Sequence, residues 1–375
     1  MASIWLALPG AVIWLVILAL PWRPWLTGET LDCEEPVKDS DLSDVTVLIP
    51  ARNEAEMLPI ALATLVRQGA NLEIVVVDDQ SQDGTASLIR DLSLACLRLV
   101  VGTAPPAGWS GKLWALEQGR RQVRRPLILL LDADIELRPG LVAALRAKLR
   151  RDRLQLVSLM ARLRTESLWE KLLVPAFVYF FKLLYPFRLA NDPACPHVAA
   201  AAGGCILVEA RVLEEVGAFT SIRGELIDDC ALAARVKAKG FATWIGLTRS
   251  VHSIRRYDRL WPVWNMVARS AFTQLHHSSL LLLGVTSAIL AGYCLPLLAL
   301  AVGSPIAVVL SLIALTAMTL SYLPTLRFYR LSSAWALALP LIGLLYLAMT
   351  WSSAYHWWVG RGSAWKGRTY SDMRG

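Results

Sequence analysis

The sequence predicts an α/β domain, built on a mostly parallel, Rossmann-like sheet, with membrane-spanning helices at both ends of the chain. Long apolar segments stand at the two ends. Between them, short β-branched runs alternate with amphipathic stretches, which is typical of a parallel sheet covered on both faces. The composition agrees, with 55% hydrophobic and 18% charged residues, against roughly 45–50% and about 25% in ordinary soluble domains.

Residues 1–22 are expected to form an N-terminal transmembrane helix. Residues 3–22 carry no charge and are about as long as a bilayer crossing requires. A cleaved signal peptide is the alternative, but the basic region that should open it is missing. Because Arg23 follows the segment and no Lys or Arg precedes it, the positive-inside rule places the next domain in the cytoplasm.

Residues 42–278 are expected to form the α/β domain. Strands are predicted at Val45–Pro50, Glu73–Val77, Leu97–Val101 and Leu127–Leu131, and helices at Glu54–Gln68, Thr85–Leu92, Lys112–Arg121 and Pro139–Arg150. Within this domain, residues 168–190 are apolar but too charged and Pro-broken to span a bilayer. The cations Lys171, Lys182 and Arg188, together with many aromatic residues, favour a helix lying in the membrane interface. A buried core helix is the alternative.

Residues 279–375 are expected to hold the C-terminal transmembrane helices and a short basic tail. Leu280–Tyr322 is long enough for two crossings with a turn at 303–305, and Ala334–Trp357 is a third apolar stretch. The tail cations are Arg361, Lys366, Arg368 and Arg374. Counting crossings places this tail outside, against the positive-inside rule, unless one segment is re-entrant, for example at Pro340.

The charge balance favours a membrane partner. There are 38 basic and 30 acidic residues, which leaves a net charge of +8, and both nucleic acid and anionic lipid favour a basic surface. The sequence has no zinc-finger, RNP or heptad pattern. We therefore expect the membrane as a partner and no nucleic acid.

Polar residues follow each predicted strand, where ligands bind in open α/β sheets. Asp132 and Asp134 are one residue apart after a buried strand and suit Mg²⁺ or Mn²⁺, although solvated loop acids match this pattern too. Asp78 and Asp79 follow another strand and are able to accept hydrogen bonds from a base or ribose. A turn with a helix cap is the alternative there. The stretch from Pro50 to Glu54 follows the first strand and suits a nucleotide or a helix cap.

Two further groups fit a reaction at a diphosphate. Lys112 stands near a predicted helix N-terminus, which suits a diphosphate, although a surface lysine is the usual alternative. Asp228 and Asp229 precede another predicted helix. They either favour its dipole or supply the carboxylate base that an acceptor hydroxyl needs.

These stretches together resemble a known family. The successive signatures of inverting family-2 glycosyltransferases with a GT-A fold are similar to VTVLIPARNEA, VVVDDQSQDGT, GWSGKLWALEQG and LLLDADI. The hopene-associated membrane glycosyltransferases, linked to hopanoid lipids, resemble the chain also in AAAAGGCILV, RGELIDDCALAARVKAKG and VARSAFTQL. The resemblance runs from about Val45 to the membrane segments.

The resemblance implies a role for each matching residue. The nucleotide-sugar site would comprise Pro50, Arg52, Glu54, Asp78, Asp79, Lys112 and Asp132. Asp132 and Asp134 would bind the metal, with Asp134 the stronger ligand. Asp229 would be the catalytic base, and Asp228 would take the place of the Glu in the family's Glu-Asp motif. Acceptor-side or active-site candidates are Gly203, Gly204 and Arg269.

The sequence departs from the family pattern at two motifs. The usual ED-x-D-L becomes Asp228-Asp229-Cys230-Ala231-Leu232, so the second acid is lost. The Gln-x-x-Arg-Trp box of processive members keeps only Arg269, which favours transfer of a single sugar over polymer synthesis.

The expected function is metal-dependent transfer of a single sugar, with inversion, from a nucleotide sugar to a hopanoid-related lipid. The enzyme would be a multi-pass protein of the bacterial inner membrane with a cytoplasmic catalytic domain. A ceramide- or polyprenyl-type acceptor is an alternative. Less favoured are a nucleotidylyltransferase, which would be expected to carry a Gly-rich first loop, and a non-catalytic membrane scaffold.

Overall fold

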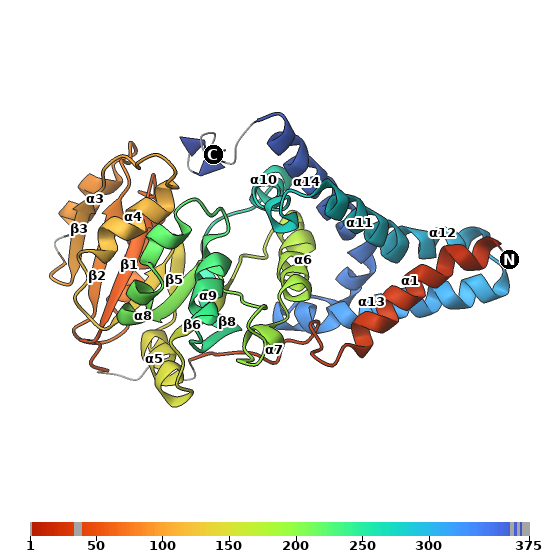
Figure 1. Cartoon of the computed structure of the whole chain (residues 1–375), viewed down its shortest axis with the longest axis horizontal. Helices are drawn as coiled ribbons and strands as arrows, with labels where there is room; N and C mark the ends of the chain where they lie inside the picture. Colours follow the sequence, from red (N-terminus) through yellow and green to blue (C-terminus); the bar gives the residue numbers. More distant parts are fainter. Residues whose placement is uncertain (1, 34–39, 93, 361–363, 366–367, 370–375) are drawn as a thin grey trace. The chain divides into compact units, whose positions relative to one another are not determined.

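The computed structural model describes residues 2–33, 40–92, 94–360, 364–365 and 368–369. The predicted tail cations Arg361, Lys366 and Arg374 lie outside the described residues. The chain forms two compact units, visible in Figure 1. The sheet unit comprises Glu29–Arg164, Leu189–Arg256 and Ala364–Gly375, and the helical unit comprises Met1–Gly28, Thr165–Arg188 and Tyr257–Ser363.

The sheet unit is built on eight strands in the order β3-β2-β1-β4-β7-β6-β8-β5. They are β1 (Val45–Ala51), β2 (Glu73–Asp78), β3 (Leu97–Val101), β4 (Leu127–Leu131), β5 (Ile135–Leu137), β6 (Leu156–Arg162), β7 (Cys205–Glu209) and β8 (Thr243–Ser253). Strands β1 to β4 are all parallel, whereas β7 runs antiparallel to both β4 and β6. Strand β8 is parallel to β6, and β5 is antiparallel to β8. The mostly parallel sheet and its first four strands are confirmed.

Helices cover both faces of this sheet because the strands are apolar on both sides. In β1, Val47 and Ile49 belong to one buried cluster and Leu48 to the other, as the alternation of a strand requires. The first face carries α2 (Leu58–Leu65), α3 (Thr85–Asp91) and α5 (Leu141–Arg151), and the second carries α4 (Gly111–Arg120), α8 (Ala210–Glu215), the 3₁₀ turn Ala218–Ile222 and α9 (Asp228–Ala238). Helix α4 packs so closely that a Cβ at Gly119 would clash with Leu48 and Val77.

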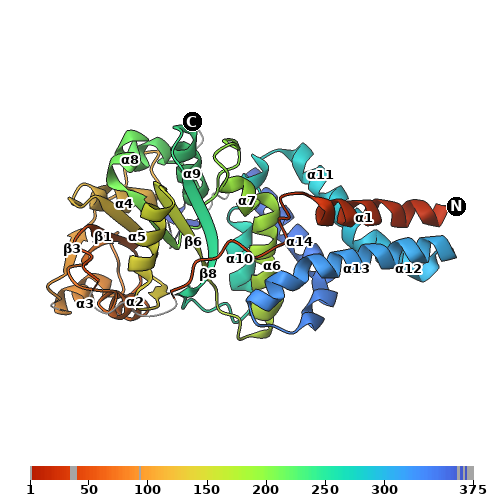
Figure 2. The ribbon, with the colours of Figure 1, turned by 90° about the horizontal axis from the view of Figure 1, so that it is seen from below.

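Among its described residues, the helical unit contains three helical segments long and apolar enough to cross a membrane, Ser279–Val302, Pro305–Phe328 and Ser333–Trp358. Its helices are α1 (Ala2–Ala19), α6 (Leu168–Leu184), α10 (Leu260–Ala268), α11 (Ser279–Ile289), α12 (Leu295–Val302), α13 (Pro305–Phe328) and α14 (Leu339–Trp358), with α7 (Phe187–Ala190) at the boundary between the units. Figure 2 shows α1 alongside α13. The turn expected at 303–305 is confirmed, since Ser304 precedes the first residue of α13. Pro340 lies in the first turn of α14.

Helix α6 belongs to the helical unit, although its residues fall inside the predicted 42–278 domain. Its apolar face packs on α10, α13 and α14. Lys182, which favoured an interfacial helix in the sequence, is 1% exposed. Its ammonium donates to the carbonyl of Leu26 at 3.0 Å and to Oγ1 of Thr325 at 3.2 Å. These hydrogen bonds inside the unit replace the water that the ammonium loses on burial. The interfacial position of the helix stays a prediction.

Candidate active site

The loops after β1 and β2 are joined by hydrogen bonds. Asn53 has a left-handed backbone (φ 53°), and its Oδ1 accepts from the amide of Gln82 at 2.9 Å. The Asn53 amide donates to Oγ of Ser81 at 2.9 Å, and the Glu54 amide donates to Oγ1 of Thr85 at 3.0 Å. Asn adopts this backbone more readily than most residues, which explains its place in the turn. The two loops therefore form one ordered rim at the carboxyl edge of the sheet.

Three of the predicted nucleotide-binding side chains lie in this rim. The guanidinium of Arg52 bonds to the carbonyl of Asp79, and its Nη1 lies 3.8 Å from Oδ2 of the same residue. Asp78 accepts from the amide of Ser81 through Oδ2, whereas its buried Oδ1 has no hydrogen-bond partner among the described residues. A buried acceptor without a partner costs about 1–3 kcal/mol. An N–H group of a bound ligand would remove that cost.

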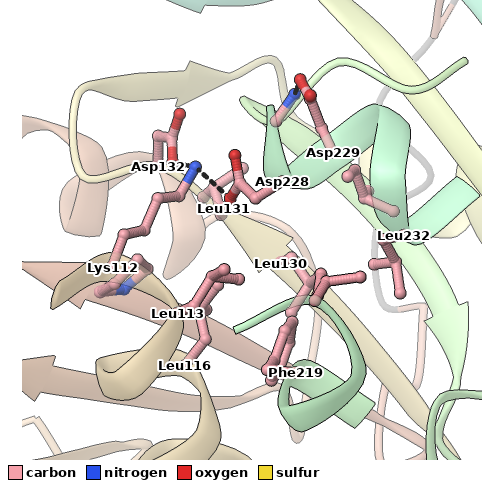
Figure 3. Close-up of a pocket in the computed structure, with 14 residues that line it drawn as sticks. Lys112, Leu113, Leu116, Leu130, Leu131, Asp132, Phe219, Asp228, Asp229 and Leu232 are labelled. Carbon is pink, nitrogen blue, oxygen red and sulfur yellow. Dashed lines mark hydrogen bonds and ion pairs between the residues drawn. The ribbon is translucent and has the colours of Figure 1, made fainter. Parts of the chain in front are cut away.

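Lys112 lies at the centre of a pocket at the same edge. Ser110 caps α4 by accepting from the amide of Leu113 at 3.3 Å, which fixes Lys112 in the first turn. The ammonium of Lys112 lies 3.1 Å from Oδ1 of Asp132 and 3.2 Å from Oδ2 of Asp228 (Figure 3). The sequence placed Lys112 near a diphosphate, and the structure adds that it joins the first acid after β4 to the acids at the start of α9.

Six of the predicted site residues line this pocket, and they come from separate parts of the chain. They are Pro50 from β1, Lys112 from α4, Asp132 after β4, Gly203 before β7, and Asp228 and Asp229 from α9. An apolar floor lies beneath them, formed by residues that include Leu113, Leu116, Leu130 and Phe219 (Figure 3). Folding therefore gathers six of the predicted site residues around one cavity.

Charges in the pocket stabilise the lysine as a cation. Burial opposes the charge of Lys112, but attraction to Asp132, Asp228 and Asp229 outweighs it and raises the lysine pKa. Burial also raises the pKa of Asp132, with the neighbouring acids adding to the effect and Lys112 opposing it. The ammonium is thus a fixed positive charge among carboxylates, of the kind that stabilises a developing anion.

Asp229 is oriented by two backbone amides. Gly203 donates to Oδ2 at 2.7 Å and Cys230 donates to Oδ1 at 2.8 Å. Burial and then the charge of Asp228 raise the pKa of Asp229 to about 6, against the opposing effects of Lys112 and the two amides. A base with a pKa near the working pH is well matched to proton transfer.

Asp134 lies on the other side of this edge, where β8 ends. Its Oδ2 accepts from Oγ of Ser253 at 2.8 Å and from Nε of Arg255 at 3.1 Å. The same guanidinium donates through Nη2 to Oε1 of Glu54 at 2.8 Å. Arg255 thereby joins Glu54, in the loop after β1, to the second acid after β4. Sequence reasoning missed Arg255 and Ser253, and the only signal was a pair of arginines after an apolar run.

The donor set suits a divalent metal completed by a ligand. Among the described residues, no three His, Cys, Asp or Glu side chains gather into a metal cage. The ion pairs of Asp132 and Asp134 each use a single oxygen, Oδ1 of the first and Oδ2 of the second. Mg²⁺ is typically held by one or two carboxylates together with substrate phosphates. Two carboxylates at the strand end fit that arrangement.

Gly204 and Arg269, the other two acceptor-side candidates, are not among the residues that line this pocket. The carbonyl of Gly204 accepts from the amide of Asp132 at 3.3 Å, so Gly204 shapes the strand end. Arg269 belongs to the helical unit and follows the last residue of α10. Its assignment to the acceptor side stays a prediction.

The sequence matches known proteins over part of its length. Residues 46–217 match the model of glycosyl transferase family 2. The 4,4'-diaponeurosporenoate glycosyltransferase of Staphylococcus haemolyticus is 33% identical over 93 residues, 25% of this chain and 24% of that protein. The undecaprenyl-phosphate 4-deoxy-4-formamido-L-arabinose transferase of Aeromonas hydrophila is 30% identical over 107 residues, 28% of this chain and 32% of that protein. The chain thus spans between a quarter and a third of these relatives.

A solved structure shares the fold over most of the chain. The mannosyltransferase PcManGT from Pyrobaculum calidifontis, in complex with GDP-Man and Mn²⁺, aligns with a TM-score of 0.50 and 20% identity, covering 94% of this chain and 96% of that one. This likeness confirms the GT-A fold.

Proposed function

We propose that the protein, whose residues 46–217 match the glycosyl transferase family 2 model, is a glycosyltransferase. It would transfer a single sugar, with inversion, from a nucleotide sugar to a lipid in the bacterial inner membrane. The observation that carries this proposal is the position of Lys112. Its ammonium contacts both Asp132 and Asp228, so the donor-side acid and the acceptor-side acids share one pocket.

The donor would occupy the rim and the pocket together. Asp78 and Asp79 would contact the base or ribose, with Arg52 ordering their loop. The diphosphate would lie toward Lys112, whose charge stabilises a phosphate anion. This orientation leaves the anomeric carbon near the acids of α9.

Transfer is a direct displacement. Asp229 accepts the proton of the acceptor hydroxyl as the hydroxyl oxygen attacks the anomeric carbon. A new bond forms between that oxygen and the carbon, while the bond from the carbon to the diphosphate oxygen breaks and its electron pair leaves with the nucleoside diphosphate. The positive charge of Lys112 offsets the charge that develops on the leaving group.

Mg²⁺ or Mn²⁺ would be held by Asp132 and Asp134. When bound, the ion acts as a Lewis acid on the leaving diphosphate. Asp228 orients the lysine through its 3.2 Å contact, which keeps the ammonium beside the reacting groups.

A lipid acceptor is supported by the three apolar helices and by the names of the two curated relatives, which act on 4,4'-diaponeurosporenoate and undecaprenyl phosphate. A hopanoid headgroup follows from the resemblance to the hopene-associated glycosyltransferase HpnB. The position of Arg23 directly after the first apolar segment supports a cytoplasmic catalytic domain. A ceramide- or polyprenyl-type acceptor is the second candidate, and the polyprenyl name among the relatives favours it.

The test is transfer of label by the purified protein. A panel of labelled nucleotide sugars is incubated with Mn²⁺ and membrane lipids, and the lipid phase is extracted and counted, after lipid profiling of a deletion strain has named the missing product. We expect label in lipid from one donor. Release of pyrophosphate from a nucleoside triphosphate and a sugar phosphate would instead indicate a nucleotidylyltransferase, and no turnover of any donor would indicate a scaffold.

A further inference from the structure

Arg255 lies between two carboxylates that belong to different parts of the donor site. Nη2 lies 2.8 Å from Oε1 of Glu54, and Nε lies 3.1 Å from Oδ2 of Asp134. Both acids are nearly buried, with side-chain exposures of 8% and 13%. Because buried carboxylates require a nearby cation, Arg255 compensates both charges at once.

The pairing of strands fixes this arrangement. Ser253 pairs with Ile135 between β8 and β5, and the amide of Ile254 donates to the carbonyl of Asp134 at 3.0 Å. Ser253 also donates from its hydroxyl to the same oxygen, Oδ2, that Arg255 contacts. The strand pairing and these two hydrogen bonds thus hold the backbone of residues 253–254 beside Asp134. Arg255 follows directly in the chain, so its guanidinium is held there as well.

We propose that Arg255 is a positioning residue that links divalent-metal binding to diphosphate binding. Its guanidinium takes the cationic place beside Asp134. A metal ion that binds without a diphosphate has to share this carboxylate with the guanidinium, which carries a charge of the same sign. The metal ion therefore binds weakly. A diphosphate gives the guanidinium a new anionic partner and removes the conflict. Metal and diphosphate therefore strengthen each other's binding, by the same factor in both directions.

This inference rests on the proposed function for its ligands, but not on turnover. If the ion pairs of Arg255 were purely structural, the expected result would differ. Loss of Arg255 would then lower the melting temperature and leave the metal affinity and its dependence on nucleotide unchanged.

The experiment measures Mn²⁺ binding by the full chain in detergent, from the electron paramagnetic resonance signal of free Mn²⁺. Titrations are made with Mn²⁺ alone, with UDP and with GDP. In the wild type we expect weak binding of Mn²⁺ alone and tighter binding with one of the two nucleotides. In Arg255→Gln we expect tighter binding of Mn²⁺ alone, by about tenfold, which corresponds to about 1.4 kcal/mol, and a smaller gain from the nucleotide.

Arg256→Gln is the matched control, since the neighbouring Arg256 is exposed and loses the same charge. We expect it to bind Mn²⁺ as the wild type does. If Arg255→Gln does not fold, Arg255→Lys keeps the charge and loses the two-armed contact, and its nucleotide gain should also shrink. If a folded Arg255 variant binds Mn²⁺ with the wild-type affinity and gains as much from nucleotide as the wild type does, this inference is overturned and the proposed function is not. A wild type that binds neither Mn²⁺ nor either nucleotide would overturn it together with the proposed donor site.

Discussion

The backbone amide of Gly203 donates a hydrogen bond of 2.7 Å to Oδ2 of Asp229. The glycine precedes β7 and the aspartate is the second residue of α9, so two segments 26 residues apart meet at the proposed base. A Cβ on Gly203 would lie 3.3 Å from Nζ of Lys112 and 3.4 Å from Oδ2 of Asp229. The absence of a side chain at this position lets the backbone approach both groups.

Gly203→Ala should therefore lower kcat while the protein stays folded. The new methyl group requires Nζ of Lys112 to shift by a few tenths of an ångström and lies in contact with Oδ2 of Asp229. A displacement of about 1 Å at a catalytic group costs on the order of 10²-fold. We expect a loss of about tenfold, measured by steady-state transfer together with a thermal melt. Gly28→Ala is the control, since nothing lies within 4 Å of its Cβ position. Equal kcat in the two variants would count against the close approach.

The rate should depend on pH through Asp229. Its pKa is raised to about 6, chiefly by burial, so the base is protonated and inactive below that pH. We expect kcat to rise by about tenfold per pH unit below pH 6 and to level off above it. A profile that is already flat at pH 5 would show that an unperturbed carboxylate, or another group, carries the proton. The Asp229→Asn variant should not show this rise of kcat with pH below pH 6.

Removal of the metal should abolish transfer. Excess EDTA should stop the reaction, and added Mn²⁺ or Mg²⁺ should restore it, because the proposed ion balances the charge of the leaving diphosphate. Asp134→Ala should be inactive with a wild-type circular dichroism spectrum. Full activity in excess EDTA would disprove the metal assignment.

Helix α4 offers a prediction that is independent of catalysis. Gly119 packs against Leu48 and Val77 without space for a side chain. Overpacking a core typically costs about 1–3 kcal/mol, so Gly119→Val should lower the melting temperature. Gly28→Val has open space and should not. A Gly119→Val protein as stable as the wild type would show that α4 shifts to accommodate the change.

The first half of the sheet was predictable because its signals are local. Each of β1, β2 and β4 is a short apolar run, and polar residues follow at the next turn, so the candidate acids could be named without a structure. The later strands were not named. The order of β7, β6 and β8 depends on antiparallel pairings between distant segments, and no local pattern encodes these.

Contacts between loops were the other feature that the sequence did not predict. The sequence indicated that Lys112 is close to a helix N-terminus, but its contact with Asp228 joins residues more than a hundred positions apart. The bridge from Arg255 to Glu54 spans 201 positions. Such ion pairs depend on the final packing of the strands, and side-chain type alone does not reveal them.

The central claim, that Asp229 is the base and Asp228 supports it, is tested most directly by comparing kcat and donor affinity of Asp229→Asn and Asp228→Asn. General-base assistance contributes about 10²–10⁴-fold, or roughly 2.7–5.5 kcal/mol. We predict that Asp229→Asn loses kcat on this scale with nearly intact donor binding, and that Asp228→Asn loses less, since it acts through Lys112. An inactive Asp228→Asn beside a normal Asp229→Asn would move the assignment by one residue, and full activity of both would contradict it.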